Sequence, residues 1–516
     1  YKKLGKMDAL KDEYVKNRPV AVHKAWFAFV PSYEGGTGAA STTEEGAPKD
    51  TPSKGGGSNF LAWLPGWYET VLNLITEERR QSLAVFGSEL VPEIVIKVLR
   101  ECFRPILPSF QSRLESLYSS NPTAPAKGSL ENICAVYEAT LQFLSLAYEN
   151  VAGGWLDWME SGQHSTVSIS DHSGISLYKD ITSIFLQVAS PFALYQERMP
   201  VLETKHSSVA AKLVADDIAQ AVSTSSTDLT SLQDATDRLK GLAAFVFPLA
   251  EGALARFELM NGGFGVRQSL GAVDALIAGH AEELSKAIRA LSTAMTANNE
   301  DLAENFDDQH VLCALEVLKV AGSFGREFKS FEGKTRERLA VLAERMALFA
   351  ATEKKIEDTL SGAAKTSSDG PFQLPDSLSP VEIDSFLVKN VCGSGESHID
   401  DDANTATLAL LTRLADVGEG GEKTQQPQGG DAAAAVVLYA QVEEATQILA
   451  NSCHTFVYDV CSSVPRRHLS GISTMGAWKE EAGAADIASY GTLPQNYITH
   501  VGEHMLALVQ ALEPFA

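Results

Sequence analysis

Hydrophobic residues recur at steps of three and four positions along most of the chain. This spacing places apolar side chains on one face of an α-helix, which can then pack against a neighbour while the opposite face meets solvent. Three stretches show the pattern most clearly: Leu61, Leu64, Tyr68, Val71 and Ile75; Leu270, Val273, Ile277, His280, Leu284 and Leu291; and Leu339, Leu342, Met346 and Phe349. Alternation with a period of two, which is the signal of strands, does not persist. The pattern predicts an all-α protein.

One helix start is explicit in the sequence. Ser379 is a capping residue, Pro380 fits the first helical position, and the Glu382 carboxylate stands where it can reach back to the cap. Leu378 and Ile383 occupy the two positions of a hydrophobic staple. These residues together predict a helix that begins at Ser379.

A second region predicts a helix start and a kink. Thr230 and Gln233 have the spacing of a weaker capping box. Further along, the stretch from Leu242 to Phe257 is apolar nearly all round, which is typical of a buried helix. Pro248 lies inside that stretch, and proline removes a helical hydrogen bond and crowds the preceding turn. We therefore expect one buried helix with a kink at Pro248.

Compositional breaks separate the helical stretches. Residues 32–59 are rich in Gly, Ser and Pro and almost free of apolar side chains, which predicts a disordered linker. Shorter breaks at 119–129, 361–379, 393–406 and 418–431 favour an extended helical-bundle rod with long disordered loops over a compact enzyme. The predicted division is 1–31, the end of an N-terminal helical region; 32–59, linker; 60–360, helical bundle; 361–379, linker; and 380–516, an acidic helical region with disordered insertions at 393–431.

The acidic balance excludes some classes of partner. The formal net charge of -24 argues against nucleic acid, whose backbone requires clustered Lys and Arg. Residues 1–26 carry a net +4 (seven basic, three acidic), whereas residues 380–516 carry a net -12 (six basic, eighteen acidic). This asymmetry fits solvated helix faces, and it also fits a partner surface of complementary charge.

Cysteine usage predicts reduced cytosolic thiols, and the hydrophobic run lengths predict no membrane span. The six cysteines contain no CxxC pair and are too sparse for a disulfide scaffold, which predicts reduced thiols. The chain contains no run of about 18 uncharged apolar residues, so no membrane span is expected. The chain begins at Tyr1 in the middle of a pattern, so it resembles a fragment.

The strongest candidate for catalysis is His500-Val501-Gly502-Glu503-His504, which matches the H-x-x-E-H pattern of inverted zinc peptidases. Two histidines four residues apart share a helix face and can bind one Zn²⁺, while Glu503 would act as general base. Against this hypothesis, Gly502 weakens the helix. The histidines also lie roughly 90° from the centre of the apolar stripe, which is formed by Ile498, Val501, Met505, Leu508 and Leu512.

Other groups of polar residues have a structural interpretation beside the chemical one. Cys453, His454 and Cys461 lack the spacing of a zinc knuckle, which favours buried thiols and a surface histidine. Gly262, Gly263 and Gly265 lack the strand and the third glycine of a nucleotide loop and predict a turn between helices. His280 lies in an apolar stripe, which favours a hydrogen-bonded core histidine over a ligand. Asp400, Asp401 and Asp402 lack EF-hand spacing, and Trp63, Trp67 and Tyr68 are better explained as core or interface anchors.

Motifs near both ends of the chain resemble one known family. At the C-terminal end they are Ile472-Ser-Thr-Met-Gly-Ala-Trp478, Leu493-Pro-Gln-Asn-Tyr497-Ile-Thr-His-Val-Gly502 and Leu512-Glu-Pro-Phe515; near the start they are Tyr14-Val-Lys-Asn-Arg-Pro19, His23-Lys24 and Trp26. In this order they resemble subunit seven of the conserved oligomeric Golgi complex. The segment from Phe60 to Ile75 is similar in character to the family's next helix.

The resemblance implies a function without chemistry of its own. It implies a subunit of a peripheral, cytosolic tethering complex on Golgi membranes, which captures vesicles in retrograde transport within the Golgi and supports glycosylation indirectly. The implied partners are sibling subunits five, six and eight and, through the complex, vesicle SNAREs and small GTPases. No catalytic residue, cofactor or metal is implied, and the zinc hydrolase with His500, Glu503 and His504 is the alternative.

Overall fold

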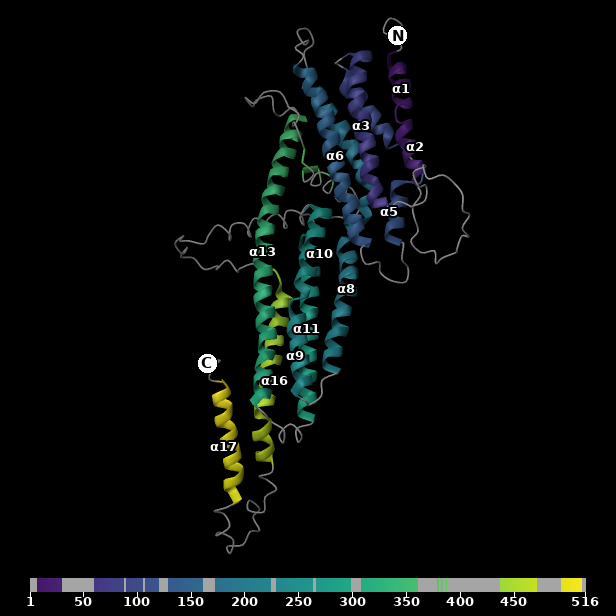
Figure 1. The fold of residues 1–516 in the computed structure, drawn as a ribbon. Helices are drawn as coiled ribbons and strands as arrows, with labels where there is room; N and C mark the ends of the chain where they lie inside the picture. The colour runs from purple at the N-terminus through teal and green to yellow at the C-terminus, as the bar shows by residue number, and fades with distance from the viewer. Residues whose placement is uncertain are drawn as a thin grey trace, which may run out of the picture. The chain divides into compact units, whose positions relative to one another are not determined.

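The computed structural model describes residues 7–29, 60–87, 90–104, 107–119, 129–160, 172–223, 229–262, 266–297, 308–360, 378–379, 382–383, 387, 437–470 and 493–512. Every regular element within these ranges is helical, which confirms the all-α prediction (Figure 1). The predicted linkers at 32–59 and 393–431 lie outside the described residues, and so does most of 361–379. The predicted division into regions stays a prediction.

The chain forms two compact units, each built from three stretches of sequence. Unit 1 comprises residues 1–202, 255–266 and 339–417, and unit 2 comprises residues 203–254, 267–338 and 418–516. Each unit therefore depends on contacts between segments that are distant in the sequence.

Unit 1 is a bundle whose central helices are strongly amphipathic. Its helices are α1 (Met7–Asn17), α2 (Val20–Ala28), α3 (Phe60–Phe86), α4 (Val91–Cys102), α5 (Phe110–Ser119), α6 (Ser129–Glu160), α7 (His172–Ala189), the 3-10 turn η3 (Ser190–Phe192), the first part of α8 (Ala193–Ser223), the end of α10 (Val246–Asn261) and the later part of α13 (Asp308–Leu360). Helix α3 packs against α4 and α6. The stripe predicted at 60–75 is confirmed, since Leu64, Val71 and Ile75 are fully buried.

An aromatic cluster joins the N-terminal helices to this bundle. Trp26 is fully buried, and its indole N–H donates to the Pro108 carbonyl oxygen at 2.9 Å. The Arg113 guanidinium stacks over the same indole ring at 4.5 Å and donates to the Trp26 carbonyl oxygen at 2.8 Å. The Trp67 indole N–H donates to the Val22 carbonyl oxygen at 3.1 Å. These bonds satisfy both indole N–H groups and the Trp26 and Val22 carbonyl oxygens, whereas the buried Arg113 Nε makes no hydrogen bond.

The N-terminal motif also supplies a buried ion pair. The Glu78 carboxylate, whose side chain is 1% exposed, pairs with the Arg18 guanidinium at 3.1 Å and accepts a hydrogen bond from the Tyr14 hydroxyl at 2.8 Å. Burial, followed by the neighbouring Glu78 carboxylate, raises the pKa of the Tyr14 hydroxyl. A buried carboxylate requires such partners, so the motif residues Tyr14 and Arg18 fasten α1 to α3.

Unit 2 contains the rest of α8, α9 (Leu229–Ala243), most of α10 (Val246–Asn261), α11 (Val266–Ala297), the first part of α13 (Asp308–Leu360), α16 (Ala440–Ser470) and α17 (Leu493–Leu512). The stripe predicted along α11 is confirmed, because its six residues are all buried. The third predicted stripe falls in the later part of α13, which belongs to unit 1, and there Leu339 and Leu342 are buried. The side chains of Met346 and Phe349 lie outside those that the structure describes.

The single kinked helix predicted from Leu242 to Phe257 is wrong. Helix α9 ends at Ala243, a turn follows, and α10 begins at Val246. Pro248 consequently lies in the first turn of α10, where its missing N–H leaves no helical hydrogen bond unmade. In a continuous helix that N–H would have bonded to the Ala244 carbonyl oxygen, which instead accepts from the Phe247 N–H at 3.3 Å.

Two of the three predicted helix ends are confirmed. The Ser379 backbone N–H donates to the Glu382 carboxylate at 2.8 Å, and the Glu382 N–H donates to the Ser379 hydroxyl oxygen at 3.3 Å, which forms the capping box. Gly262 follows α10 with a φ of 54°, as a left-handed residue after a helix requires. Thr230, in contrast, lies inside α9, which begins at Leu229, so the weaker capping box is wrong.

Candidate functional site

The start of helix α16 is held by residues from two other helices of unit 2. Asp274 of α11 is 7% exposed, and its two carboxylate oxygens accept hydrogen bonds from the Gln441 and Val442 N–H groups at 3.2 and 3.0 Å. The hydroxyl of Tyr439, which is 1% exposed, donates to the Thr335 hydroxyl oxygen of α13 at 3.3 Å. A carboxylate at a helix N-terminus satisfies orphan N–H groups and complements the helix dipole. Asp274 therefore fixes where α16 begins.

Helix α17 packs beside the end of α16 (Figure 1). The His504 Nε2 donates to the Cys461 carbonyl oxygen at 2.9 Å, since a carbonyl can only accept. Val501 and Leu508, which share this side of α17, are half-buried. One side of α17 is thus attached to α16, and His504 and the half-buried Val501 and Leu508 lie on that side.

The face of α17 beside this attached side is apolar and open. Its large side chains are highly exposed: Ile498 by 57%, Met505 by 47%, Leu506 by 62% and Val509 by 61%. We call these four residues, with Gly502 between them, the open face of α17. A contiguous exposed apolar surface of this kind is typical of a protein or membrane interaction site. The open face is the candidate functional site of the described residues.

The predicted zinc motif does not form a metal site in this arrangement. His500 is exposed, and its Nδ1 lies 3.9 Å from the Glu503 carboxylate, whose side chain is 71% exposed. His504 turns toward α16 and uses Nε2 for the Cys461 carbonyl. No group of three or more His, Cys, Asp or Glu side chains placed to hold a metal ion occurs among the described residues. His500 and Glu503 therefore lie near each other on the exposed side of α17, whereas His504 is turned toward α16.

The cysteine and histidine group of α16 has the structural role predicted for it. Cys453 is fully buried, and His454 is exposed. Burial raises the pKa of the Cys453 thiol to about 11 and also raises the pKa of the Cys461 thiol, which is half-buried. Protonated thiols are weak nucleophiles and poor metal ligands, so these cysteines act as small apolar side chains.

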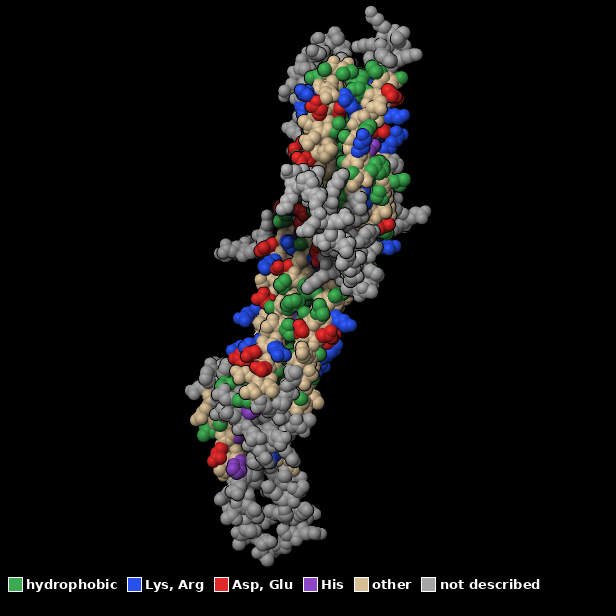
Figure 2. Space-filling view, turned by 45° about the vertical axis from the view of Figure 1, so that its right-hand side comes forward, with side chains coloured by type: hydrophobic (Ala, Val, Ile, Leu, Met, Phe, Trp, Pro, Cys, Tyr) green, Lys and Arg blue, Asp and Glu red, His purple; other side chains and the backbone are tan. Residues whose placement is uncertain are grey.

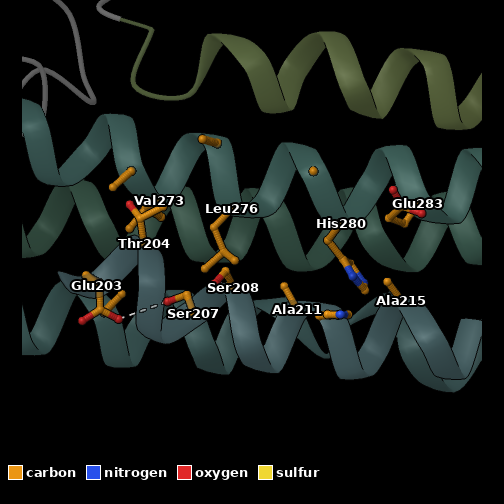
Figure 3. Close-up of a pocket in the computed structure, with 15 residues that line it drawn as sticks. Glu203, Thr204, Ser207, Ser208, Ala211, Ala215, Val273, Leu276, His280 and Glu283 are labelled. Carbon is orange, nitrogen blue, oxygen red and sulfur yellow. Dashed lines mark hydrogen bonds between the residues drawn. The ribbon is translucent and has the colours of Figure 1, made fainter. Parts of the chain in front are cut away.

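A pocket of about 380 Å³ lies between α8 and α11 (Figure 3). Small and apolar side chains form most of its wall, among them Ala211 and Ala215 of α8 and Val273 and Leu276 of α11. At one end the Ser207 hydroxyl donates to the Glu203 carboxylate at 3.1 Å. The volume falls within the range of small ligand pockets. The lining offers apolar contact rather than a set of converging catalytic groups.

His280 also lines this pocket, and it is the hydrogen-bonded core histidine that the sequence favoured. It is 7% exposed, and its Nε2 donates to the Leu242 carbonyl oxygen near the end of α9 at 3.0 Å. Burial lowers the pKa of the His280 imidazole. His280 therefore satisfies a carbonyl where α9 terminates.

The remaining candidates are placed as follows. Trp67 and Tyr68 are buried and Trp63 is half-buried, all within the aromatic cluster, as predicted for core anchors. Tyr68 stacks on Phe143 with the ring centroids 4.3 Å apart. Asp400, Asp401 and Asp402 lie outside the described residues.

The charged surface and the helix lengths bear on the class of partner. On the face shown in Figure 2, Lys and Arg side chains are interspersed with Asp and Glu side chains. None of the described helices is long and apolar enough to cross a membrane.

Sequence reasoning missed two features of this site. Asp274 was not identified as a cap, because it lies more than 160 residues before the helix that it caps. The sequence analysis gave the apolar residues of α17 as a single stripe, but Ile498 and Met505 are exposed whereas Val501 and Leu508 are half-buried. The signal available for the second feature was the near absence of charge around the whole of α17.

Comparisons with known proteins identify similar sequences. The model of the family described as Golgi complex component 7 (COG7) matches residues 1–391 and 394–516. The chain is similar to conserved oligomeric Golgi complex subunit 7 of Arabidopsis thaliana, with 21% identity over 550 residues that cover 100% of this chain and 61% of the relative. The chain therefore spans less than two thirds of that relative's length. No solved structure matches the chain significantly.

Proposed function

This chain belongs to the Golgi complex component 7 family, and from that premise we propose that it acts as a subunit of a multisubunit tethering complex at the Golgi. In this role it takes part in the retrograde transport of vesicles within the Golgi and in Golgi organisation, and glycosylation depends on it indirectly. The observation that carries the proposal is the family match, which extends over nearly the whole chain.

The described structure is consistent with a protein that works by presenting surfaces. Its described residues form helical bundles whose polar atoms are used for packing, as in the Asp274 cap and the Glu78 ion pair. The open face of α17 supplies an apolar surface of the kind that protein interfaces bury at their centre. Binding energy in such interfaces comes from a few large side chains in desolvated contacts.

The proposed partners are subunits five, six and eight of the same complex, with vesicle SNAREs and small GTPases reached through the assembly. We place the chain on the cytosolic face of the Golgi, where association with the membrane is peripheral and is mediated by the complex. The absence of a membrane-spanning helix among the described residues is compatible with this placement.

The zinc hydrolase receives no support from the geometry. A catalytic zinc site requires three protein ligands around one open position. In this chain His500 and Glu503 are exposed, and the Nε2 of His504 is engaged by the Cys461 carbonyl oxygen.

Affinity purification from cells of the source species tests the proposed function. With a tag on this chain and quantitative mass spectrometry, we expect subunits five, six and eight to be recovered in near-stoichiometric amounts. A tagged cytosolic helical protein of similar size serves as the control. Recovery of the folded chain without any of these subunits would contradict the proposal.

A further inference from the structure

We propose that the open face of α17 is the docking surface for an amphipathic helix of another subunit, and that this partner helix carries Lys or Arg beside its apolar stripe. The inference rests on the proposed function, which requires that the chain assemble with other subunits. It adds the surface, the kind of element that binds there and the charge of that element.

The exposed side chains form a single stripe. At about 100° per residue, Ile498, Gly502, Met505 and Val509 lie within roughly 60° of one another around α17, and Leu506 extends the stripe on one side. Their spacing of four, three and four residues extends over three helical turns, about 16 Å. This is the pattern of anchors by which one helix lies against another or in a groove.

The stripe cannot turn inward without breaking the contact of α17 with α16. His504 is on the attached side, where its Nε2 donates to the Cys461 carbonyl oxygen at 2.9 Å, and half-buried Val501 and Leu508 flank it. Rotating α17 to bury Leu506 and Val509 would expose these side chains and leave the Cys461 carbonyl oxygen without the imidazole. The structure therefore holds the open face outward.

Gly502 provides room for a partner side chain at the centre of the stripe. A Cβ built at Gly502 meets no atom within 4 Å, so the space above the helix backbone is empty. Small residues between large apolar ones allow a neighbouring helix to approach closely and to insert a side chain between them. A helix is therefore a better fit to this stripe than a flat surface.

The charge of the chain decides between possible occupants. Helix α17 contains neither Lys nor Arg, whereas helices that lie on anionic membranes carry basic residues beside their apolar face. Glu503 at the margin of the stripe is 71% exposed, and it is the one Asp, Glu, Lys or Arg residue of α17. A second copy of α17 would bring the same negative charge and no Lys or Arg to complement it. A helix with basic residues beside an apolar stripe is complementary to both the apolar open face and the negative charge of Glu503.

The test is co-expression of the full chain with subunits five, six and eight of the same species, each tried separately and then together. Affinity of the purified chain for the subunit that binds is measured by biolayer interferometry. The first variant is Leu506→Asp with Val509→Asp, which places charge on the stripe. We expect binding to weaken by about 30-fold or more, the effect of losing a hot-spot contact.

A second variant separates binding from folding. Gly502→Leu adds a side chain at the empty position and improves helix propensity, so it fills the space intended for the partner without disturbing the attached side. We expect it to weaken binding at least tenfold while the melting temperature stays the same or rises. The matched control is Leu213→Asp on α8, where Leu213 is 58% exposed and belongs to another surface.

The outcomes distinguish this inference from the proposed function. If the unaltered chain binds none of the three subunits, the proposed function fails and the inference fails with it. If the unaltered chain binds a subunit and both stripe variants bind it equally well, the docking surface is wrong while the proposed function stands. Two further results would overturn the helix as occupant: a dimer seen by light scattering that the stripe variants abolish, or binding to phosphatidylcholine–phosphatidylserine vesicles that they abolish. Affinity that rises as the salt concentration increases would contradict the presence of Lys or Arg beside the apolar stripe of the partner helix.

Discussion

Asp274 provides the sharpest test of how unit 2 is held together, and the perturbation is its replacement by alanine. The side chain caps a helix from a different helix, so its removal leaves the fold of α11 unchanged and affects the start of α16. The Gln441 and Val442 N–H groups then lose acceptors that lie at 3.2 and 3.0 Å. Val442 is fully buried, so water does not readily replace the lost acceptor there.

The expected cost follows from three contributions. Loss of a capping side chain costs about 0.5–2 kcal/mol. A charged acceptor makes each hydrogen bond stronger than a neutral one, and a carboxylate at a helix N-terminus adds about 0.3–1 kcal/mol. We therefore expect Asp274→Ala to destabilise the first turns of α16 by about 2 kcal/mol. Asp274→Asn keeps one acceptor oxygen without the charge, and about 1 kcal/mol is expected.

Amide hydrogen exchange read by mass spectrometry is the appropriate assay, because a chain with two units does not unfold as one transition. In peptides that cover residues 440–456, exchange should be about 30-fold faster in Asp274→Ala and about fivefold faster in Asp274→Asn. Peptides from α6 in unit 1 should exchange at the original rate. Asp217→Ala, at an exposed position of α8, is the matched control.

The reasoning would be refuted by unchanged exchange. If Asp274→Ala alters the exchange of residues 440–456 by less than twofold, the carboxylate contributes nothing measurable to the helix start. If exchange accelerates equally in both units, the substitution acts on the whole chain and not on the cap.

Three further predictions concern single side chains. Arg18→Ala leaves the Glu78 carboxylate, 1% exposed, without its guanidinium, and amide exchange in peptides of α1 and α3 should show a destabilisation of about 2 kcal/mol; an unchanged exchange rate would mean that the ion pair contributes no measurable stability. Gly279→Ala should raise the free energy of unfolding by about 0.5–1 kcal/mol, because alanine favours the helix and the added Cβ meets no atom within 4 Å. Gly87→Ala should lower the free energy of unfolding, because Gly87 has a φ of 83°, which strains any residue with a Cβ; equal shifts for the two substitutions would contradict this reasoning. Burial lowers the pKa of the His280 imidazole, so the unfolded chain takes up this proton at higher pH than the folded chain. The free energy of unfolding should then fall as pH drops below about 6.5, and titrations of His280→Gln that show the same slope would exclude this histidine as the cause.

Local signals in the sequence were sufficient for much of the fold. The capping box at Ser379 involves residues three positions apart, and its two hydrogen bonds form as predicted. The stripe along α11 was also correct, because a period of three to four residues has one regular explanation. Both signals are complete within one segment of chain.

The break between α9 and α10 shows where such signals end. An apolar stretch without a polar face has no periodicity to mark its ends, so the kink was placed at Pro248 in one continuous helix. The structure instead ends α9 at Ala243 and uses Pro248 in the first turn of α10. The carbonyl oxygen of Leu242 near that end is satisfied by His280 from α11, a contact that no local pattern contains.

The sequence by itself determined that the chain is helical and which residues share a helix face. These properties follow from the 3.6-residue period of the helix and from residue types at short range. Only the tertiary structure decided that Asp274 caps α16 and that the apolar stripe of α17 divides into an attached side and an open side. The physical reason is that a helix face has no intrinsic partner: whether Val501 or Met505 is covered depends on what another segment of the chain places against it.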